Sequence, residues 1–180
     1  MIRLEQEINS IKNENLRQFI LNCFAKGPQE FFKIPASSSG RFHPEQSNGE
    51  GGLINHTKMV CRFANILSRA YDIRQEKTDM IIAACLLHDL HKPAYDHAIK
   101  TWEWIFKNQD ELTDNFKIIG PGELSIIADM IKTHMGRWTK YPYSKTLSEF
   151  TTSEWLVHLA DMCATDKGLS FDFNVDWVRN

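Results

Sequence analysis

Residues 81–89 read Ile-Ile-Ala-Ala-Cys-Leu-Leu-His-Asp. The apolar run belongs to a segment that is almost entirely apolar after Thr78, which predicts a central, buried helix over residues 78–90. The Lys92-Pro93 pair ends this helix, because a residue that precedes proline disfavours the helical conformation. An ionisable pair such as His88-Asp89 is costly beside such a segment unless something binds it. The pair is therefore the first candidate for a functional site.

The rest of the chain is almost entirely helical by pattern. Residues 57–71 place apolar side chains on one stripe, and Thr151 to Glu154 resembles a capping box ahead of another helix. We expect helices over residues 2–24 (broken near 13–15), 57–71, 78–90, 97–106, 123–133 and 155–165. Residues 32–52 are expected to form a long loop or a mobile cover, and residues 171–180 a short strand or an extended tail. The sequence predicts an all-α, single-domain helical bundle over residues 1–180, with its motifs in residues 51–165.

Composition excludes several classes of protein. The formal net charge of -2 gives no overall attraction to nucleic acid or to an anionic membrane, so extended nucleic acid is not an expected partner. No apolar run approaches the roughly 20 residues of a membrane span, and the first residues lack the apolar core of a signal peptide. The cysteines form no CxxC pair and fall in helical segments, which predicts a cytoplasmic protein with reduced thiols at Cys23, Cys61, Cys85 and Cys163.

Two further ionisable residues lie beside apolar sequence. His56 follows Gly51-Gly52, and Asp161 ends the run His-Leu-Ala-Asp. Together with His88 and Asp89 they offer two imidazoles and two carboxylates, a set that suits a divalent cation with positions left open for water and substrate. Helical proteins build such sites from facing helices. Each residue taken alone reads more simply as a satisfied polar group, so the metal hypothesis depends on the order and setting of all four.

These motifs resemble the HD superfamily of metal-dependent phosphohydrolases. The order His56, His88-Asp89, Asp161 is similar to its H…HD…D signature. The neighbouring residues are similar as well, in Gly-Gly-Leu-Ile-Asn-His-Thr (51–57), Leu-Leu-His-Asp-Leu-His-Lys (86–92) and His-Leu-Ala-Asp (158–161). The motifs span more than half of the chain. Residues 35–44 also resemble small HD proteins carried by phages and prophages.

The resemblance implies an all-helical fold and the hydrolysis of a phosphate ester or anhydride. It assigns His56, His88, Asp89 and Asp161 as ligands of one divalent metal ion. Such an ion lowers the pKa of a bound water and polarises a phosphoryl oxygen, and Asp89 is expected to orient that water as a catalytic residue. Manganese, magnesium, iron, nickel and cobalt accept these ligands, whereas zinc is less favoured by four protein ligands plus water.

Lys92 and His134 complete the predicted catalytic group. Lys92 lies one turn beyond His88, from where its ammonium can bind a substrate phosphate, as the resemblance implies for the lysine of HDxxK. His134 is expected to protonate the leaving oxygen or to bind a second metal. The alternative for both is a cation at a helix C-terminus, where the helix dipole favours it.

The sequence argues against a second metal. Family members with two metals supply additional histidines between the HD pair and the position of His134, but no histidine occurs between His97 and His134 here. We therefore expect one metal, with His91 and His97 at the surface or as hydrogen-bond partners of the ligands. His158, one turn before Asp161, is either such a partner or a core histidine.

Two arginines are candidate substrate contacts. Arg41 lies in the Ser- and Gly-rich loop, where it could grip an anion together with the hydroxyls of residues 37–39 and with His43, although ordinary loop composition explains this segment equally well. Arg137 is followed by aromatic residues that could stack a base, or could belong to a packed loop: Trp138, Tyr141 and Tyr143.

The sequence thus predicts a phosphohydrolase for a nucleotide or another small phosphate ester. Nucleotidase activity is the leading hypothesis. Within the enzyme hypothesis, removal of one phosphate, release of triphosphate and cleavage of a diester all remain open. The alternatives are a phosphodiesterase or exonuclease that acts on nucleic-acid ends, and a non-catalytic sensor of nucleotide or metal. An aromatic-rich helical surface would also allow a homodimer.

Overall fold

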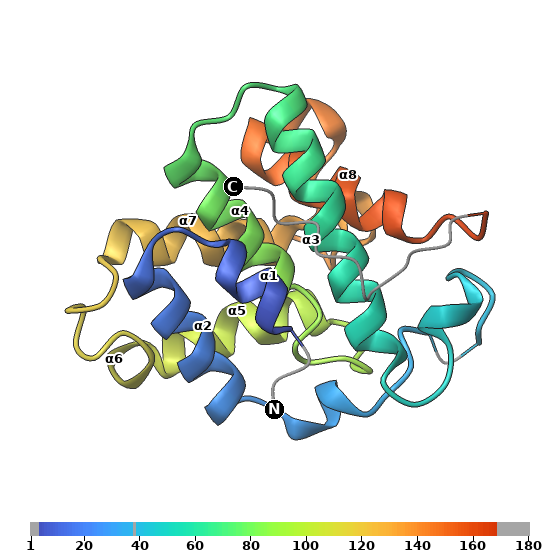
Figure 1. Cartoon of the computed structure of the whole chain (residues 1–180), viewed down its shortest axis with the longest axis horizontal. Helices are drawn as coiled ribbons and strands as arrows, with labels where there is room; N and C mark the ends of the chain where they lie inside the picture. The colour runs from blue at the N-terminus through green and yellow to red at the C-terminus, as the bar shows by residue number, and fades with distance from the viewer. Residues whose placement is uncertain (1–3, 38, 169–180) are drawn as a thin grey trace.

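A computed structural model describes residues 4–37 and 39–168 of the chain, and within these ranges it contains helices and no strand (Figure 1). The all-α prediction is confirmed; the predicted strand or tail at 171–180 lies outside the described residues. The α-helices are α1 (Glu5–Ser10), α2 (Glu14–Lys26), α3 (Gly52–Ala70), α4 (Gln75–Leu87), α5 (His97–Lys107), α6 (Gln109–Leu112), α7 (Pro121–Thr133) and α8 (Thr152–Ala164).

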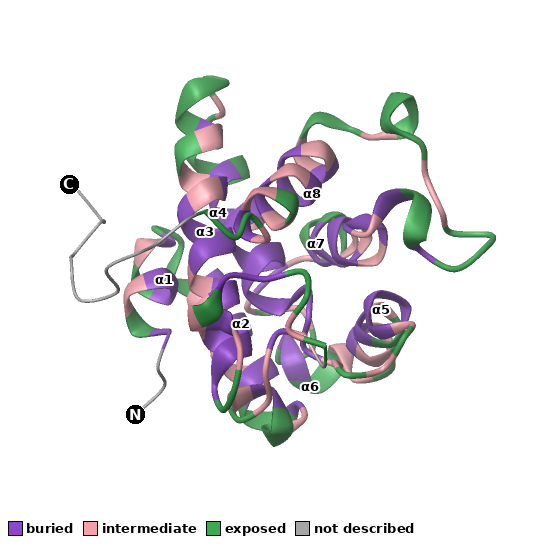
Figure 2. Cartoon of the chain, turned by 90° about the vertical axis from the view of Figure 1, so that its right-hand side faces the viewer, coloured by how far each residue is buried: buried purple, intermediate pink, exposed green. Residues whose placement is uncertain are grey.

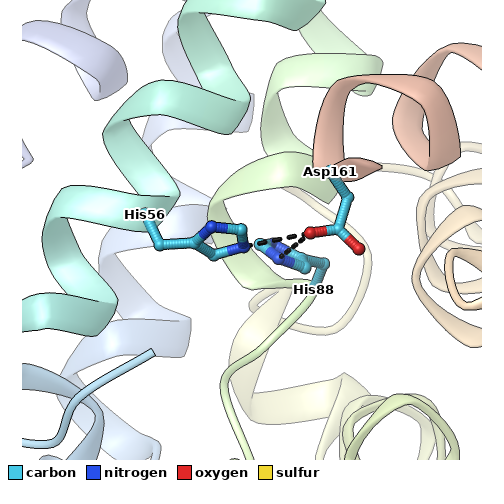
Figure 3. A group of neighbouring side chains, drawn as sticks. All are labelled: His56, His88 and Asp161. Carbon is cyan, nitrogen blue, oxygen red and sulfur yellow. Dashed lines mark hydrogen bonds and ion pairs between the residues drawn. The ribbon is translucent and has the colours of Figure 1, made fainter. Parts of the chain in front are cut away.

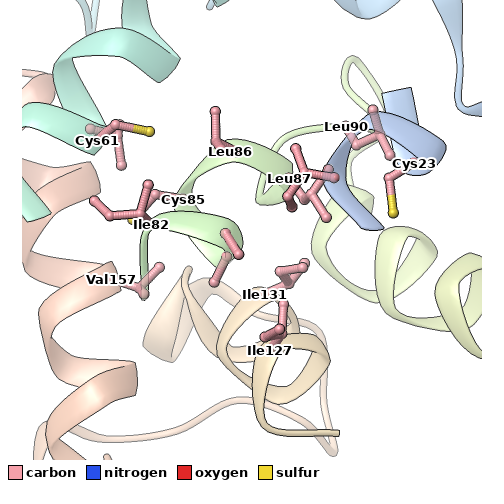
Figure 4. Packing of buried hydrophobic residues seen from close by; sticks show 14 of the residues in the cluster. Cys23, Cys61, Ile82, Cys85, Leu86, Leu87, Leu90, Ile127, Ile131 and Val157 are labelled. Carbon is pink, nitrogen blue, oxygen red and sulfur yellow. The ribbon is translucent and has the colours of Figure 1, made fainter. Parts of the chain in front are cut away.

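Helix α4 is the centre of the fold. It contacts α1, α2, α3, α7 and α8, and Figure 2 shows it buried among them. All residues from Ile81 to Leu87 are buried, because a helix that is apolar on every side must be covered on every side. Figure 4 shows the packing, in which Cys85, Leu86 and Leu87 lie among residues of α3, α7 and α8, including Cys61, Ile127, Ile131 and Val157.

The central helix ends earlier than the sequence predicts. It stops at Leu87 rather than at residue 90, and Lys92-Pro93 lies five residues further on. The chain then continues in tight turns, in which the amides of Leu90 and Lys92 donate to the carbonyls of Leu87 and Asp89. His88 and Asp89 therefore lie at the end of the helix and in the turn that follows it.

Other helix boundaries also differ from the prediction. Helix α7 begins at Pro121, two residues before the predicted start at 123, because a proline at this position loses no helical hydrogen bond. The capping box before α8 is confirmed, since the Thr151 side chain accepts from the Glu154 amide and the Glu154 side chain accepts from the Thr151 amide.

Helix α3 begins at Gly52, five residues before the predicted start, and two glycines explain why. Gly51 has φ +72°, a conformation that suits glycine, and Gly52 lies so close to the preceding loop that a Cβ there would overlap the carbonyl of Ser47. The loop is held against the helix by hydrogen bonds, including Asn55 to the carbonyl of Gln46 at 2.6 Å. Where the structure describes it, the loop is thus attached to the helix that carries His56.

The cysteines are free, and all but Cys163 are buried, which agrees with their predicted role as core thiols. Among the helices of the described residues, none is long and apolar enough to cross a membrane.

Candidate active site

The four residues predicted as metal ligands lie together in one buried cluster. His56 comes from α3, His88 and Asp89 from the end of α4, and Asp161 from α8 (Figure 3). His56 Nε2 lies 3.0 Å from Asp161 Oδ1, and His88 Nε2 lies 3.2 Å from Asp89 Oδ2 and 3.7 Å from Asp161 Oδ1. Both histidines are fully buried, as is Asp89. Residues more than 70 positions apart in the sequence thus converge because α3 and α8 both pack on α4.

Two further histidines join the cluster. His134, at the end of α7, places Nε2 3.8 Å from Asp89 Oδ1, and His97, at the start of α5, places Nε2 2.9 Å from the same oxygen. The two Nε2 atoms lie 3.4 Å apart. Of the two alternatives expected for His97, a surface residue or a partner of the ligands, the structure agrees with the second, because α5 packs on α7 and His97 is buried next to Asp89.

The backbone fixes the orientation of three of these imidazoles. The Nδ1–H groups of His88, His97 and His134 donate to the carbonyl oxygens three residues earlier in the chain, at 2.7, 3.0 and 2.7 Å. A ring that donates from Nδ1 presents the lone pair of Nε2. All three lone pairs therefore point toward the carboxylates, which is the arrangement that a metal-binding imidazole needs.

The cluster fits a divalent cation. Nε2 of His88 and both carboxylate oxygens of Asp89 are buried without a well-formed hydrogen bond, which is costly unless another group binds them. Two sets of side chains offer ligand atoms within 4.8 Å of one another: His56, His88 and Asp161, and His88, Asp89 and His134. The single-metal expectation stays a prediction, since ligands for a second cation are also present.

The charges of the cluster follow from burial and from close contacts. Burial lowers the pKa of His56, and it lowers the pKa of His134 to about 3. Burial alone would raise the pKa of Asp89, but the charges of His88, Lys92 and nearby groups outweigh it and hold that pKa well below its usual value. Asp161 likewise keeps a lowered pKa despite burial, because it pairs with the histidines. The carboxylates are thus ionised and His56 and His134 are neutral, the forms that bind metals, whereas Asp89 and Asp161 outweigh burial and raise the pKa of His88.

Lys92 is the cation closest to Asp89. Its Nζ lies 2.6 Å from Asp89 Oδ2 and donates to the carbonyl oxygen of Ala36 at 3.2 Å. Burial lowers the pKa of Lys92, but the carboxylates of Asp89 and Asp161 outweigh this and raise it, so the ammonium stays charged. Lys92 therefore lies at the cluster as predicted, and it also connects the cluster to the loop before α3.

His43 is a site residue that the sequence prediction did not include among the catalytic or ligand groups. Its ring meets that of His56 edge to face at 4.8 Å between centroids, and its Nδ1 is buried without a partner. Burial and the nearby His56 lower the pKa of His43 to about 4, so the ring is neutral near pH 7. One sequence feature could have identified His43 as a site residue. It lies in the loop just before Gly51-Gly52, and this glycine pair lets the loop pack against α3.

The remaining predicted residues lie outside the buried cluster. Arg41 is exposed, and its predicted role in substrate binding stays a prediction. Arg137 lies over the ring of Trp138 at 4.5 Å. His91 pairs with Thr101 rather than with the cluster. His158 is buried and donates from Nδ1 to the backbone carbonyl of His134 at 2.6 Å, which fits the expected alternative of a hydrogen-bonded core histidine.

Comparison with known proteins agrees with this geometry. The sequence model of the HD domain matches residues 53–166, which contain all four predicted ligands. The chain belongs to the HD domain family. The comparison with solved structures gave no significant match.

A curated relative of this HD domain protein is the dihydroneopterin 2',3'-cyclic phosphate phosphodiesterase of Methanocaldococcus jannaschii. The two are 34% identical over 103 residues, which make up 52% of this chain and 41% of the relative. The HD domain protein therefore matches less than half of the relative's length. The family and this relative together support the prediction of a hydrolase that acts on phosphate ester bonds.

Proposed function

We propose that this HD domain protein hydrolyses a phosphate ester bond of a nucleotide or another small phosphorylated molecule. The observation that carries the proposal is the convergence of His56, His88, Asp89 and Asp161 on one buried cluster beside the ammonium of Lys92. These four residues would hold a divalent cation. When bound, such a cation lowers the pKa of a coordinated water and polarises a phosphoryl oxygen.

The residues of the chain have separate roles in this proposal. Asp89 stays ionised and orients the attacking water through Oδ1, the carboxylate oxygen that faces His97 and His134 rather than Lys92. Lys92 supplies a positive charge for the phosphate. His134 is neutral, and its Nδ1–H is committed to Ile131, so its Nε2 lone pair favours a ligand or proton-accepting role over the predicted role of proton donor.

The relative favours a second candidate reaction. Because its name describes a cyclic phosphate phosphodiesterase, the hydrolysis of a 2',3'-cyclic phosphodiester is the alternative to monoester hydrolysis. Both reactions use the same residues, since both need a water activated beside a phosphoryl group. They differ in whether inorganic phosphate or a monoester is released.

The test combines metal analysis with a substrate panel. The purified protein is analysed for bound metal and is then offered 5'-mononucleotides, 2',3'-cyclic mononucleotides and short oligonucleotides with each added divalent ion. We expect near-stoichiometric metal and turnover of a mononucleotide, with a loss of at least about 100-fold in Asp89→Asn. The matched control is Asp129→Asn, which removes a surface carboxylate paired with Lys132 and should retain activity.

Each outcome separates the candidates. Unchanged turnover in Asp89→Asn would overturn the assignment of the site. Cleavage of oligonucleotides with mononucleotides spared would move the function to nucleic-acid ends. Bound metal without turnover of any substrate would favour a sensor over an enzyme.

A further inference from the structure

A cavity of about 440 Å³ lies between the 3-10 turns Gly136–Trp138 and Leu147–Glu149, with His158 of α8 in its wall. Neither the metal ligands nor Lys92 line it. Its walls are formed by Arg137, Trp138, Lys145, Thr146, Leu147 and His158. The proposed chemistry leaves this cavity without a role.

The cavity is connected to the cluster through His158. The Nδ1–H of this residue donates to the carbonyl oxygen of His134 at 2.6 Å, and His158 precedes Asp161 by one turn of α8. Residues three apart on a helix lie on the same side, so the wall of the cavity and the predicted ligand are neighbours on α8. The cavity and the cluster therefore adjoin at His158 and His134.

The walls combine aromatic surface with positive charge. Trp138 is 48% exposed, and the guanidinium of Arg137 lies over its ring at 4.5 Å. Among the residues that the structure describes, Arg137 has no carboxylate partner, whereas Lys145 is paired with Glu154 at 2.6 Å. An uncompensated cation stacked on an exposed indole is suited to a flat, electron-rich ring that carries an anionic group.

Other aromatic side chains pack against His158, which forms the aromatic wall of the cavity together with Trp138. The ring of His158 is backed by those of Phe150 and Trp155, at 5.2 and 5.8 Å between centroids. Gly136 has φ +58°, and a Cβ there would lie 3.3 Å from both Phe150 and His158. Glycine thus lets the turn that carries Trp138 approach His158, whose ring centroid lies 6.5 Å from that of the indole.

We propose that this cavity binds the heterocyclic base of the substrate, with the base stacked on Trp138 and the guanidinium of Arg137 next to it. The inference rests on the proposed phosphohydrolase function and narrows its substrate class. It selects phosphate esters that carry a nucleobase or a similar flat nitrogen heterocycle over plain sugar phosphates. Trp138 and Arg137 then determine specificity and take no part in bond cleavage.

The test separates base binding from catalysis. Adenosine and ribose, which contain no phosphate to hydrolyse, are titrated into the intact protein by calorimetry. We expect adenosine to bind and ribose not to bind, and we expect Trp138→Ala to weaken adenosine binding at least about fivefold, the low end of what the loss of one base–aromatic stack costs. Trp138→Phe keeps a ring and should restore most of the binding. Tyr141→Ala is the matched control, because Tyr141 is an exposed aromatic residue of the same loop that does not line the cavity.

Turnover of adenosine 5'-monophosphate and ribose 5-phosphate, which share the same monoester, is measured in parallel. Equal binding of adenosine and ribose, or equal effects of Trp138→Ala and Tyr141→Ala, would overturn the inference. If adenosine binding depends on Trp138 but no phosphate ester is hydrolysed, the result supports base binding in the cavity and contradicts the proposed phosphohydrolase function. If both monoesters are hydrolysed with the same kcat/KM in the wild type and in Trp138→Ala, the result supports the proposed phosphohydrolase function and contradicts base binding in the cavity.

Discussion

His97 Nε2 lies 2.9 Å from Asp89 Oδ1, although His97 begins a different helix. The contact attaches α5 to the end of α4 across the Lys92-Pro93 turn. It also gives Asp89 two different neighbours, since one carboxylate oxygen meets His97 and the other meets Lys92. Lys92 pairs with Oδ2, whereas His97, whose Nδ1–H donates to Ala94, presents its Nε2 lone pair to Oδ1, so His97 and Asp89 are placed to share a cation.

The first prediction concerns this contact. His97→Ala should lower kcat/KM about 10- to 100-fold and reduce the metal content of the purified protein, because the cluster loses a nitrogen that is placed to share a cation with Asp89. The measurement is steady-state hydrolysis of the preferred phosphate ester together with metal analysis.

A nearby histidine provides the control. His91→Ala removes an imidazole that pairs with Thr101, away from the cluster, and should change kcat/KM by less than about threefold. Equal effects of the two substitutions would show that His97 contributes only to packing.

The second prediction concerns Lys92. Lys92→Gln should raise KM or lower kcat at least about tenfold for a phosphate ester, because it removes the positive charge next to Asp89 while keeping a similar length. The metal content should change far less than it does in Asp89→Asn. Lys100→Gln, which removes an exposed ammonium paired with Asp96, should behave like the wild type. Activity of Lys92→Gln within twofold of the wild type would contradict the role of Lys92 at the phosphate.

The cluster could be predicted from the sequence only where local pattern and motif coincide. The apolar run before His88 predicts the buried central helix, and the order of the motifs, with the resemblance to the HD superfamily, predicts His56 and Asp161, which the structure places 3.0 Å apart and next to His88. Periodicity identifies which face of a helix is buried, and a buried ionisable residue is informative because it is rare.

For His97 the sequence left a surface position and a place beside the ligands open, and for His43 it indicated only a loop that could grip an anion. His97 follows the Lys92-Pro93 turn, and only the packing of α5 on α7 brings it to Asp89. His43 lies in a loop without periodicity, and its position depends on the close approach of Gly52 to Ser47. Both depend on long-range contacts, which a local pattern does not contain.

The third prediction tests that close approach. Gly52→Ala should destabilise the protein by several kcal/mol or displace residues 44–47, because the new Cβ would overlap the backbone carbonyl of Ser47 and backbone cannot move aside as a side chain can. Displacement of this loop would also move His43 away from His56. Chemical denaturation measures the free energy of unfolding, and hydrolysis measures the effect on the site.

The control for this substitution is Gly122→Ala. Gly122 lies in the first turn of α7, and a Cβ there would have no atom within 4 Å. Alanine should leave the free energy of unfolding unchanged or raise it by up to about 1 kcal/mol, because it favours the helix. A Gly52→Ala protein as stable and as active as Gly122→Ala would contradict the packing described here.

The last prediction concerns the pH dependence of stability through Glu154. Burial alone would raise the pKa of this carboxyl, but Lys145 at 2.6 Å and the hydrogen bonds to Thr151 outweigh it and lower the pKa below its usual 4.5. A group whose pKa is lowered on folding stabilises the protein above its unfolded pKa, and this contribution is lost as the pH falls through the folded pKa. Glu154→Gln should therefore cost about 1–2 kcal/mol at pH 7.

The difference between the two proteins should shrink as the pH is lowered below 4.5, because the wild-type carboxyl becomes protonated and glutamine does not titrate. Urea denaturation of both proteins between pH 7 and pH 3 measures this difference. Glu123→Gln is the control, because Glu123 occupies the same capping position in α7 but is exposed, and it should cost less at pH 7 than Glu154→Gln. A difference between the wild type and Glu154→Gln that stays constant over this pH range would mean that the ion pair with Lys145 does not contribute to stability, and that Glu154 acts only as a neutral hydrogen-bonding cap.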